Sequence, residues 1–440
     1  MNARITRRRF VQTSAGLAAL AANPYWMAGR SRAEDSPNER PLVGAIGLGG
    51  QGTGIARRAA NHGQVVALCD VHRQHAERAK EKHFNDAEIH EDYRKLLERK
   101  DIEAVTIGTP DHWHTEIALA ALEAGKHVYC EKPLTLTIDE GKQLVAAVKK
   151  TGKVMQVGTQ QRGDQFARFG RAVATVRSGR LGKLKKVTVN LPLSTEQGGP
   201  FPAQPVPEGL NWDFWLGQAP AVDYCPERCH FRFRWWYEYS GGIATDWGAH
   251  HMDVVQWALD VENSGPMTID GTATQLPDTP AGGFNTPKLV TVNFMYPGDV
   301  HVQMLAQPPG DEGVLFEGDS GRIYVNRGRI TGKPIEEQDA DASIKDPIME
   351  AVEKLYKGNT SKMGDHMGNF FEAWKFGKWP ISDVESQHRS VSACHLANLS
   401  IRLGRKLTWD AAKEQFVGDS QADSMLKRAQ REPYRIRTVG

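Results

Sequence analysis

Two short motifs, far apart in the sequence, combine a basic side chain, a carboxylate and an imidazole. The first is centred on Lys132, and the second contains Asp246 and His250, followed by Asp253. Residues four apart on one helix share a face, so Asp246 could orient the His250 ring, with Asp253 on about the same side. An ammonium group can hydrogen-bond a hydroxyl and favour a developing alkoxide, while a neutral imidazole can accept the hydroxyl proton. Lys132, Asp246 and His250 are therefore the candidate catalytic residues.

A glycine-rich turn near the start of the chain predicts the element that must position these groups. An apolar run at 41–46 leads into Gly47-Leu-Gly-Gly-Gln-Gly52, then a helical stretch, then a second strand at 65–69 that ends at Asp70. This order is typical of dinucleotide binding, because the glycines allow a tight turn and a close approach of the backbone to a pyrophosphate. Asp70 can accept both ribose hydroxyls and would repel a 2′-phosphate, which favours NAD; Arg73 keeps NADP open. The candidate nucleotide contacts are Gly47, Gly49, Gln51, Gly52 and Asp70.

Further strands at 104–108, 127–130 and 154–157 alternate with helices at 72–83, 91–99, 115–124 and 138–150. This alternation predicts a parallel sheet covered by helices on both faces, forming a domain over residues 38–160. Ligands of such sheets bind beyond the carboxyl ends of the strands. We therefore expect the residues after the later strands to join the glycine turn in one crevice, as nucleotide contacts: Thr109, Pro110, His114, Glu131 and Lys132.

Four of these motifs together resemble the Gfo/Idh/MocA family of oxidoreductases, the glucose-fructose oxidoreductase and inositol dehydrogenase group. They are the glycine turn with Asp70, Thr109-Pro110 with His114, the run 120–133, and the run 241–250 with Asp253. The resemblance implies an α/β chain, in which an N-terminal Rossmann domain precedes a C-terminal α/β domain (161–440) with a large, mostly antiparallel open sheet. It also implies a homodimer or homotetramer, and hydride transfer from a sugar or polyol hydroxyl to a tightly bound NAD or NADP.

Within that resemblance, His250 would take the hydroxyl proton, although some relatives carry tyrosine there. His251 departs from the more usual apolar residue. Neighbouring residues on a helix diverge, so we expect no metal site at the His250-His251 pair.

The candidate substrate contacts are His250 and Asp253 together with residues from two other segments. The run 230–239 mixes aromatic and basic side chains, a composition that suits sugar faces and hydroxyls, although core packing explains such clusters equally well. Gln160 and Arg162 follow the last strand of the first domain, where they could instead link the two domains. From these two segments the candidates are Gln160, Arg162, Arg234 and Tyr237.

The first 33 residues are typical of an export signal. Arg7 and Arg8 lie in a twin-arginine-like motif, an apolar run follows at 13–22, and a small-residue cleavage site ends at Ala33. This order predicts export of the folded protein by the twin-arginine machinery into the periplasm, tethered to the membrane if the signal stays uncleaved. No later segment is apolar enough for a membrane span. Residues 1–33 hold six arginines and no acid, so the rest carries a charge of −4, which argues against a nucleic-acid partner.

Two alternatives to a net oxidoreductase remain open at this stage. In one, transient oxidation of a sugar carbon drives an elimination, as in NAD-dependent glycosidases and lyases. In the other, the chain is a non-catalytic, nucleotide-bound sugar sensor. Five cysteines leave at least one thiol free, and Cys225 with Cys229 could close a short disulfide.

Overall fold

The computed structural model describes residues 40–163, 167–277, 281–307, 311–356 and 364–437. The predicted signal segment, residues 1–33, lies outside these described residues. Among them, no helix combines the length and apolar character that crossing a membrane would need.

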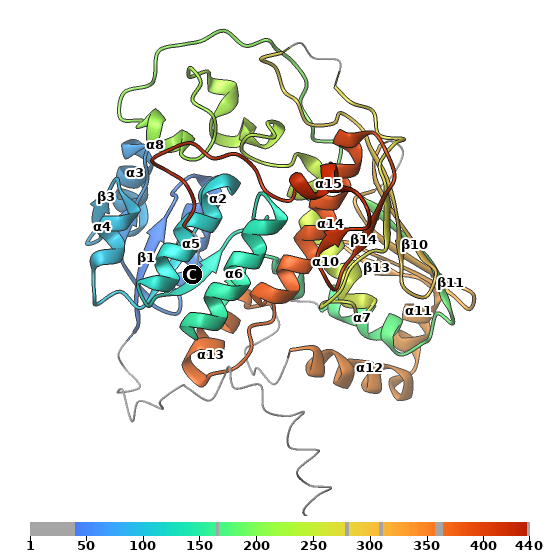
Figure 1. Ribbon diagram of the computed structural model, residues 1–440. Helices are drawn as coiled ribbons and strands as arrows, with labels where there is room; N and C mark the ends of the chain where they lie inside the picture. Colours follow the sequence, from blue (N-terminus) through green and yellow to red (C-terminus); the bar gives the residue numbers. More distant parts are fainter. Residues whose placement is uncertain (1–39, 164–166, 278–280, 308–310, 357–363, 438–440) are drawn as a thin grey trace, which may run out of the picture. The chain divides into compact units, whose positions relative to one another are not determined.

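The first domain contains a six-stranded sheet in the order β3-β2-β1-β4-β5-β6, with every neighbouring pair parallel. This is the strand order of a Rossmann fold, so the predicted fold class is confirmed. The inner strands are almost wholly buried, because helices cover both faces (Figure 1). The strands are β1 (Leu42–Ile46), β2 (Gln64–Cys69), β3 (Glu88–His90), β4 (Ala104–Ile107), β5 (His127–Cys130) and β6 (Met155–Val157). The helices are α2 (Gly50–Ala59), α3 (Arg73–His83), α4 (Tyr93–Glu98), α5 (His114–Glu123) and α6 (Ile138–Thr151).

The expected elements of this domain match those observed to within two residues at each end, apart from β3. That strand has only three residues, each exposed or half-buried, so it carries no apolar signal in the sequence.

The second domain is built on a nine-stranded sheet in the order β13-β12-β11-β7-β10-β9-β8-β14-β15. Only the β7–β10 pair is parallel, so the expectation of a mostly antiparallel sheet is confirmed. The strands are β7 (Leu184–Asn190), β8 (Thr268–Asp270), β9 (Val290–Tyr296), β10 (Val300–Ala306), β11 (Gly313–Gly318), β12 (Arg322–Val325), β13 (Ile330–Thr331), β14 (Leu407–Asp410) and β15 (Gln415–Phe416).

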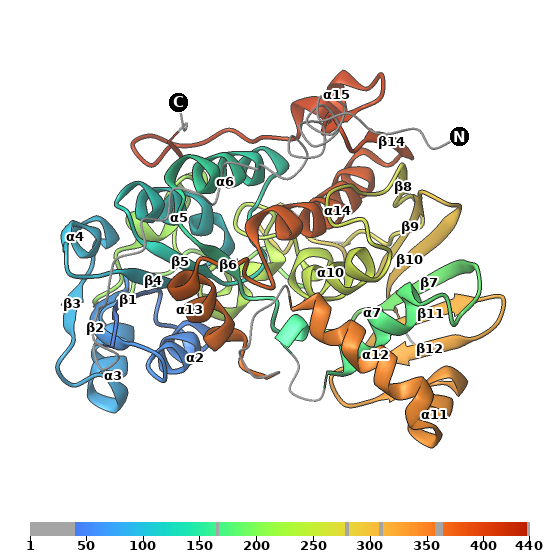
Figure 2. The ribbon, with the colours of Figure 1, turned by 90° about the horizontal axis from the view of Figure 1, so that it is seen from below.

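Helices α7, α10 and α14 pack along one face of this sheet (Figure 2). Helix α14 also packs against α6 of the first domain, so it joins the two sheets. Along β9 and β10 buried and half-buried residues alternate, which shows that only one face of the sheet is fully covered. The helices are α7 (Arg168–Arg177), α8 (Trp212–Leu216), α9 (Ile243–Asp246), α10 (Gly248–Ala258), α11 (Lys333–Ala340), α12 (Ala342–Leu355), α13 (His366–Phe376), α14 (Val384–Leu403) and α15 (Ser420–Ser424).

All five cysteines are buried and free. Cys69 and Cys130 end β2 and β5 as small core side chains. Cys225 and Cys229 flank a short 3-10 helix without forming a disulfide.

Candidate active site

A cavity of about 770 Å³ lies beyond the carboxyl ends of β1, β2, β4 and β5. Residues between 194 and 250, together with Arg327, line it from the second domain. Its volume falls within the range typical of cofactor and substrate sites. The predicted site residues that line it are Gly47, Gly49, Gln51, Gly52, Asp70, Thr109, Pro110, Glu131, Lys132, Gln160, Arg234, Asp246 and His250.

The glycine turn between β1 and α2 has the shape that a phosphate cradle requires. Gly47 has φ +79°, a conformation that favours glycine, and a Cβ there would lie 2.6 Å from the Thr109 nitrogen. A Cβ on Gly52 would collide with the Gly47 carbonyl, so the helix start packs closely against the turn. Gly49 borders open space. The turn therefore leaves room for a pyrophosphate at the start of α2.

Asp70 is fixed at the end of β2 by two backbone amides. Its Oδ2 accepts a hydrogen bond from the Leu48 nitrogen (2.7 Å), and its Oδ1 accepts one from the His72 nitrogen (2.8 Å). Arg73, which could have bound a 2′-phosphate, is paired with Glu77 (2.6 Å) and does not line the cavity. An accepting carboxylate at this position fits a ribose diol, whose hydroxyls donate, better than a negatively charged phosphate ester.

Glu131 holds two amide side chains at the cavity wall. Its Oε1 accepts hydrogen bonds from Gln51 Nε2 (3.0 Å) and Gln160 Nε2 (2.8 Å). Nearby, Thr109 Oγ1 is buried and has no hydrogen-bond partner within the described ranges. An unpaired hydroxyl on the cavity wall is a group that a bound ligand could satisfy.

Lys132 and Asp246 form an ion pair across the cavity. The Lys132 Nζ donates to Asp246 Oδ1 (2.5 Å) and to the Asp246 carbonyl (3.1 Å). Asp246 Oδ2 lies 3.4 Å from Arg234 Nε. Burial alone would raise the pKa of Asp246, but the charges of Lys132 and Arg234 lower it below its usual value. The Lys132 and Asp246 side chains are 15% and 11% exposed, so both groups remain accessible from the cavity.

The predicted helix through Asp246 and His250 is interrupted. Helix α9 ends at Asp246 and α10 begins at Gly248, with Trp247 as the junction. The carboxylate of Asp246 faces Lys132 and Arg234, and His250 Nδ1 has no hydrogen-bond partner in the described part of the chain. The expectation that Asp246 orients the imidazole is therefore wrong, because two cations from other segments take up its oxygens.

His250 lies at the cavity wall as a neutral base. Burial lowers the pKa of its ring well below the usual value, and the charges of Lys132 and Arg327 lower it further. The ring is therefore deprotonated at neutral pH, which is the form that accepts a proton.

Two cavity residues with charge were not identified from the sequence. Burial raises the pKa of Asp111 to about 7, and its Oδ2 accepts a hydrogen bond from Ser240 Oγ (2.5 Å). Arg327, between β12 and β13, lies over the Trp247 ring at 4.6 Å. Asp111 lies inside a motif singled out in the sequence, directly after Pro110, whereas Arg327 has no local signal because folding alone brings it to the site.

Two predicted residues lie behind the cavity wall. The buried His114 ring places Nδ1 2.7 Å from the Pro133 carbonyl and Nε2 3.0 Å from the Thr109 carbonyl, so it links the loops after β4 and β5. Tyr237 donates to Asn398 Oδ1 (3.4 Å) and does not line the cavity. The expected substrate contact of Tyr237 is thus not supported. The Tyr237 side chain follows two buried tryptophans in the sequence and points toward α14 instead of the cavity.

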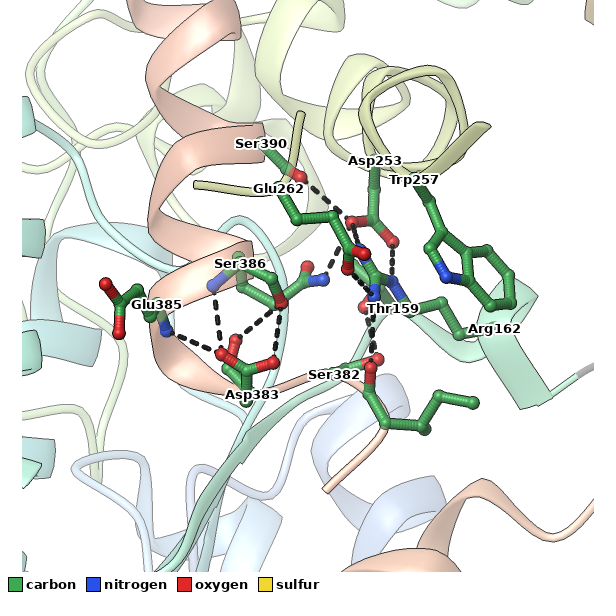
Figure 3. Close-up of polar contacts among 12 residues, drawn as sticks. Thr159, Arg162, Asp253, Trp257, Glu262, Ser382, Asp383, Glu385, Ser386 and Ser390 are labelled. Carbon is green, nitrogen blue, oxygen red and sulfur yellow. Dashed lines mark hydrogen bonds and ion pairs between the residues drawn. The ribbon is translucent and has the colours of Figure 1, made fainter. Parts of the chain in front are cut away.

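Arg162 and Asp253 form a buried ion pair away from the cavity (Figure 3). Arg162 donates to both Asp253 oxygens (2.8 and 2.6 Å) and to Glu262 Oε1 (2.7 Å). Asp253 Oδ1 also accepts from Gln387 (2.7 Å) and Ser390 (2.9 Å) on α14. Neither charged side chain of the pair is exposed. Their prediction as substrate contacts is corrected: a buried guanidinium needs a carboxylate partner, and this pair ties the segment after β6 to α10 and α14.

Two family models together cover most of the chain. Residues 42–159 match the NAD-binding Rossmann fold of the oxidoreductase family, and residues 194–436 match its C-terminal alpha/beta domain. The chain belongs to the Gfo/Idh/MocA oxidoreductase family. Its first domain is accordingly an NAD-binding domain, which confirms the predicted cofactor.

Individual relatives in this family match only part of the chain. An inositol 2-dehydrogenase of Salmonella paratyphi B is 38% identical over 127 residues, which is 28% of this chain and 38% of that protein. A glycosyl hydrolase family 109 protein of Solibacter usitatus is 36% identical over 149 residues, which is 31% of this chain and 33% of that protein. The chain thus spans little more than a third of the length of these curated relatives.

Among solved structures, the fold is similar to that of the WlbA dehydrogenase from Bordetella pertussis, described in complex with NADH and UDP-GlcNAcA. The TM-score is 0.64 at 17% sequence identity, covering 86% of this chain and 99% of that one. At this identity the likeness concerns the fold.

Proposed function

We propose that the protein oxidises a hydroxyl group of a sugar, a polyol or a related carbohydrate, using a tightly bound NAD. The observation that carries the proposal is one cavity that holds both the glycine turn with Asp70 and the Lys132–Asp246 pair with His250. The inositol 2-dehydrogenase relatives support a polyol or sugar as substrate.

Different residues of the cavity would bind different parts of the nucleotide. The glycine turn would hold the pyrophosphate at the start of α2, and Asp70 would accept the ribose hydroxyls. Glu131, with Gln51 and Gln160, would position the nicotinamide end. When bound, the nicotinamide supplies the hydride acceptor.

Lys132 and His250 act on the substrate hydroxyl. Asp246 keeps the Lys132 ammonium in place. Lys132 donates a hydrogen bond to the substrate hydroxyl oxygen and so stabilises the negative charge that develops on this oxygen. The neutral His250 ring takes the hydroxyl proton as the carbon–hydrogen bond breaks. Because burial and two nearby cations disfavour the imidazolium, His250 passes that proton on readily.

A redox-neutral variant of this chemistry is the second candidate. Oxidation at one sugar carbon acidifies the neighbouring C–H bond, a base removes that proton, the glycosidic group leaves, water adds, and reduction restores the hydroxyl. The glycosyl hydrolase family 109 relative favours this route. Asp111, whose pKa is raised to about 7, is a second titratable group on the cavity wall for the additional proton transfers.

Incubation of cofactor-loaded, full-length protein with a panel of sugars, polyols and glycosides, without added NAD, tests the proposal. Mass spectrometry of the products separates the alternatives. Ketone or lactone products support net oxidation, whereas hydrolysed or dehydrated glycosides without net oxidation support the second candidate. Sugar binding with no product from any compound would indicate the sensor and contradict both enzymatic proposals.

The proposal also includes export, which the order of charged, apolar and small residues in 1–33 supports. Export of the folded protein would carry NAD out already bound, so nucleotide release must be slow and each turnover must restore the oxidised form. In net oxidation the hydride would pass from NADH to a second carbonyl compound, and in the redox-neutral route it would return to the substrate. We expect periplasmic protein to contain near-stoichiometric nucleotide, and Arg7→Lys with Arg8→Lys to leave folded, loaded protein in the cytoplasm. Empty periplasmic protein that needs added NAD would contradict this part.

A homodimer or homotetramer formed through the half-exposed face of the nine-stranded sheet completes the proposal. The alternating burial along β9 and β10 supports it, since one face of each strand remains partly open. Light scattering after size-exclusion chromatography would measure the assembly, and a monomer at micromolar concentration would contradict it.

A further inference from the structure

Three histidines converge on the wall of the cavity and have no part in the proposed hydride chemistry. His72 precedes α3, His75 lies in its first turn, and His230 begins the 3-10 helix η5 (His230–Trp235) of the second domain. One ring nitrogen from each lies within 4.8 Å of the others. The sequence separates His230 from the other two by more than 150 residues, so only the fold brings the three together.

His72 is a buried imidazole without a hydrogen-bond partner. The residue is 8% exposed, and neither ring nitrogen is paired with any group in the part of the chain that the structure describes. Its backbone nitrogen donates to Asp70 Oδ1, which fixes the residue at the cavity wall. Buried polar atoms are nearly always paired, so this ring lacks a partner that something else must supply.

The spacing of the rings suits a shared metal ion. Their centroids are 4.5, 5.5 and 5.3 Å apart. Three imidazoles on a tetrahedral zinc ion with Zn–N bonds of about 2.1 Å would have centroids about 5 Å apart. Small side-chain adjustments would bring the nitrogens to ligand distance.

Two further observations support a metal rather than a chance cluster. Asp70 Oδ2 lies 3.5 Å from His75 Nδ1, which is the carboxylate–histidine arrangement that orients a metal ligand and leaves Nε2 for the ion. His230 adopts φ +50°, a left-handed conformation that is uncommon outside glycine. In this conformation the His230 ring contacts the rings of His72 and His75.

We propose that His72, His75 and His230 bind one divalent transition-metal ion, which joins the start of α3 to the segment 230–235. Imidazole nitrogens favour zinc and its neighbours, and three of them leave a further position for water. The site is separate from Lys132, Asp246 and His250, so it does not depend on the proposed oxidation. It would hold the second-domain segment against the nucleotide end of the cavity.

Cobalt(II) titration of untagged, full-length protein, first stripped with a chelator, tests the site directly. We expect one ion per chain and the visible absorption bands of a tetrahedral nitrogen-rich site. His72→Ala and His230→Ala should each weaken binding by at least about tenfold. His83→Ala is the matched control, since His83 is an exposed histidine of the same helix and should leave binding unchanged.

His230 is exposed, so His230→Ala keeps the proposal testable if His72→Ala does not fold. Circular dichroism establishes folding in each case. The proposal fails if cobalt does not bind stoichiometrically, or if His83→Ala weakens binding as much as the cluster variants. It also fails if His230→Ala lowers NAD affinity equally with and without chelator while cobalt binding is unchanged, because the rings would then serve the adenine.

Discussion

The Lys132–Asp246–Arg234 group and the Arg162–Asp253–Glu262 group are both clusters of cations and carboxylates, yet they differ in what surrounds them. The first borders the cavity, and its lysine and aspartate side chains are 15% and 11% exposed. In the second, neither Arg162 nor Asp253 has any exposed side-chain area, and α14 donors occupy one Asp253 oxygen. The first cluster has open hydrogen-bonding capacity for a ligand, whereas the second is satisfied internally.

This difference shows that a charged pair in a family motif is not by itself evidence of a binding site. Burial of both partners with complete hydrogen bonding marks a structural pair, whose loss leaves a charge uncompensated. Partial exposure at a cavity marks a pair that can act on a ligand.

Arg162→Ala should produce the largest effect, on stability. It leaves the buried Asp253 carboxylate without its cation, which costs about 3–5 kcal/mol of unfolding free energy. Chemical denaturation measures the loss. Full stability together with reduced turnover would show that Arg162 belongs to the active site after all.

Lys132→Ala should have the opposite effect, a large loss of activity with little loss of stability. We expect the rate of hydride transfer in a single turnover to fall about 10²–10³-fold. The unfolding free energy should change by less than about 1 kcal/mol, because Arg234 still compensates Asp246. Lys132→Arg, which keeps the charge, is the control and should recover part of the rate. If Lys132→Ala lowered the unfolding free energy as much as Arg162→Ala, the Lys132 pair would also be structural, and the distinction between the two clusters would be wrong.

Acid should destabilise the region of the Arg162 cluster through a buried histidine. Burial lowers the pKa of His366, near the Arg162 cluster, to about 3, and its Nδ1 accepts from Tyr129. The unfolded chain takes up this proton below pH about 6.5 while the folded one does not, so stability is present above that pH and lost below it. Each such histidine contributes about 1.4 kcal/mol per pH unit. His366→Gln should flatten the fall of unfolding free energy between pH 6.5 and 4, and an unchanged slope would contradict the assignment.

Arg327→Gln should give the smallest effect, confined to the cavity. Removing this cation raises the pKa of His250, so the acidic limb of the kcat/KM profile moves to higher pH. Arg329→Gln is the comparison, since Arg329 lies in the same β12–β13 segment but pairs with Asp311 and does not line the cavity. A profile unaffected by Arg327→Gln would mean that another group controls this limb.

The sequence predicted the parts of the site that depend on local order. The glycine turn, Asp70 and the loops after β4 and β5 were placed correctly, because parallel strands bring their carboxyl ends to one edge. The relation of Asp246 to His250 was not, since the helix is interrupted at Trp247 and the Asp246 carboxylate pairs with Lys132 and Arg234, which come from other segments. Tertiary packing alone brings Arg327 to the cavity, and it alone brings His230 to His72 and His75. Contacts of this kind leave no periodic pattern in the sequence.

Single-turnover absorbance of the bound nicotinamide, in His250→Asn and His251→Asn, tests whether His250 is the catalytic base. His251 does not line the cavity and lies 2.9 Å from Glu312, so it is the matched control. We expect both variants to retain nucleotide. The rate of hydride transfer should fall about 10²–10⁴-fold in His250→Asn and stay close to that of the unmodified protein in His251→Asn. Equal rates in the two variants would contradict the assignment of His250 as the base.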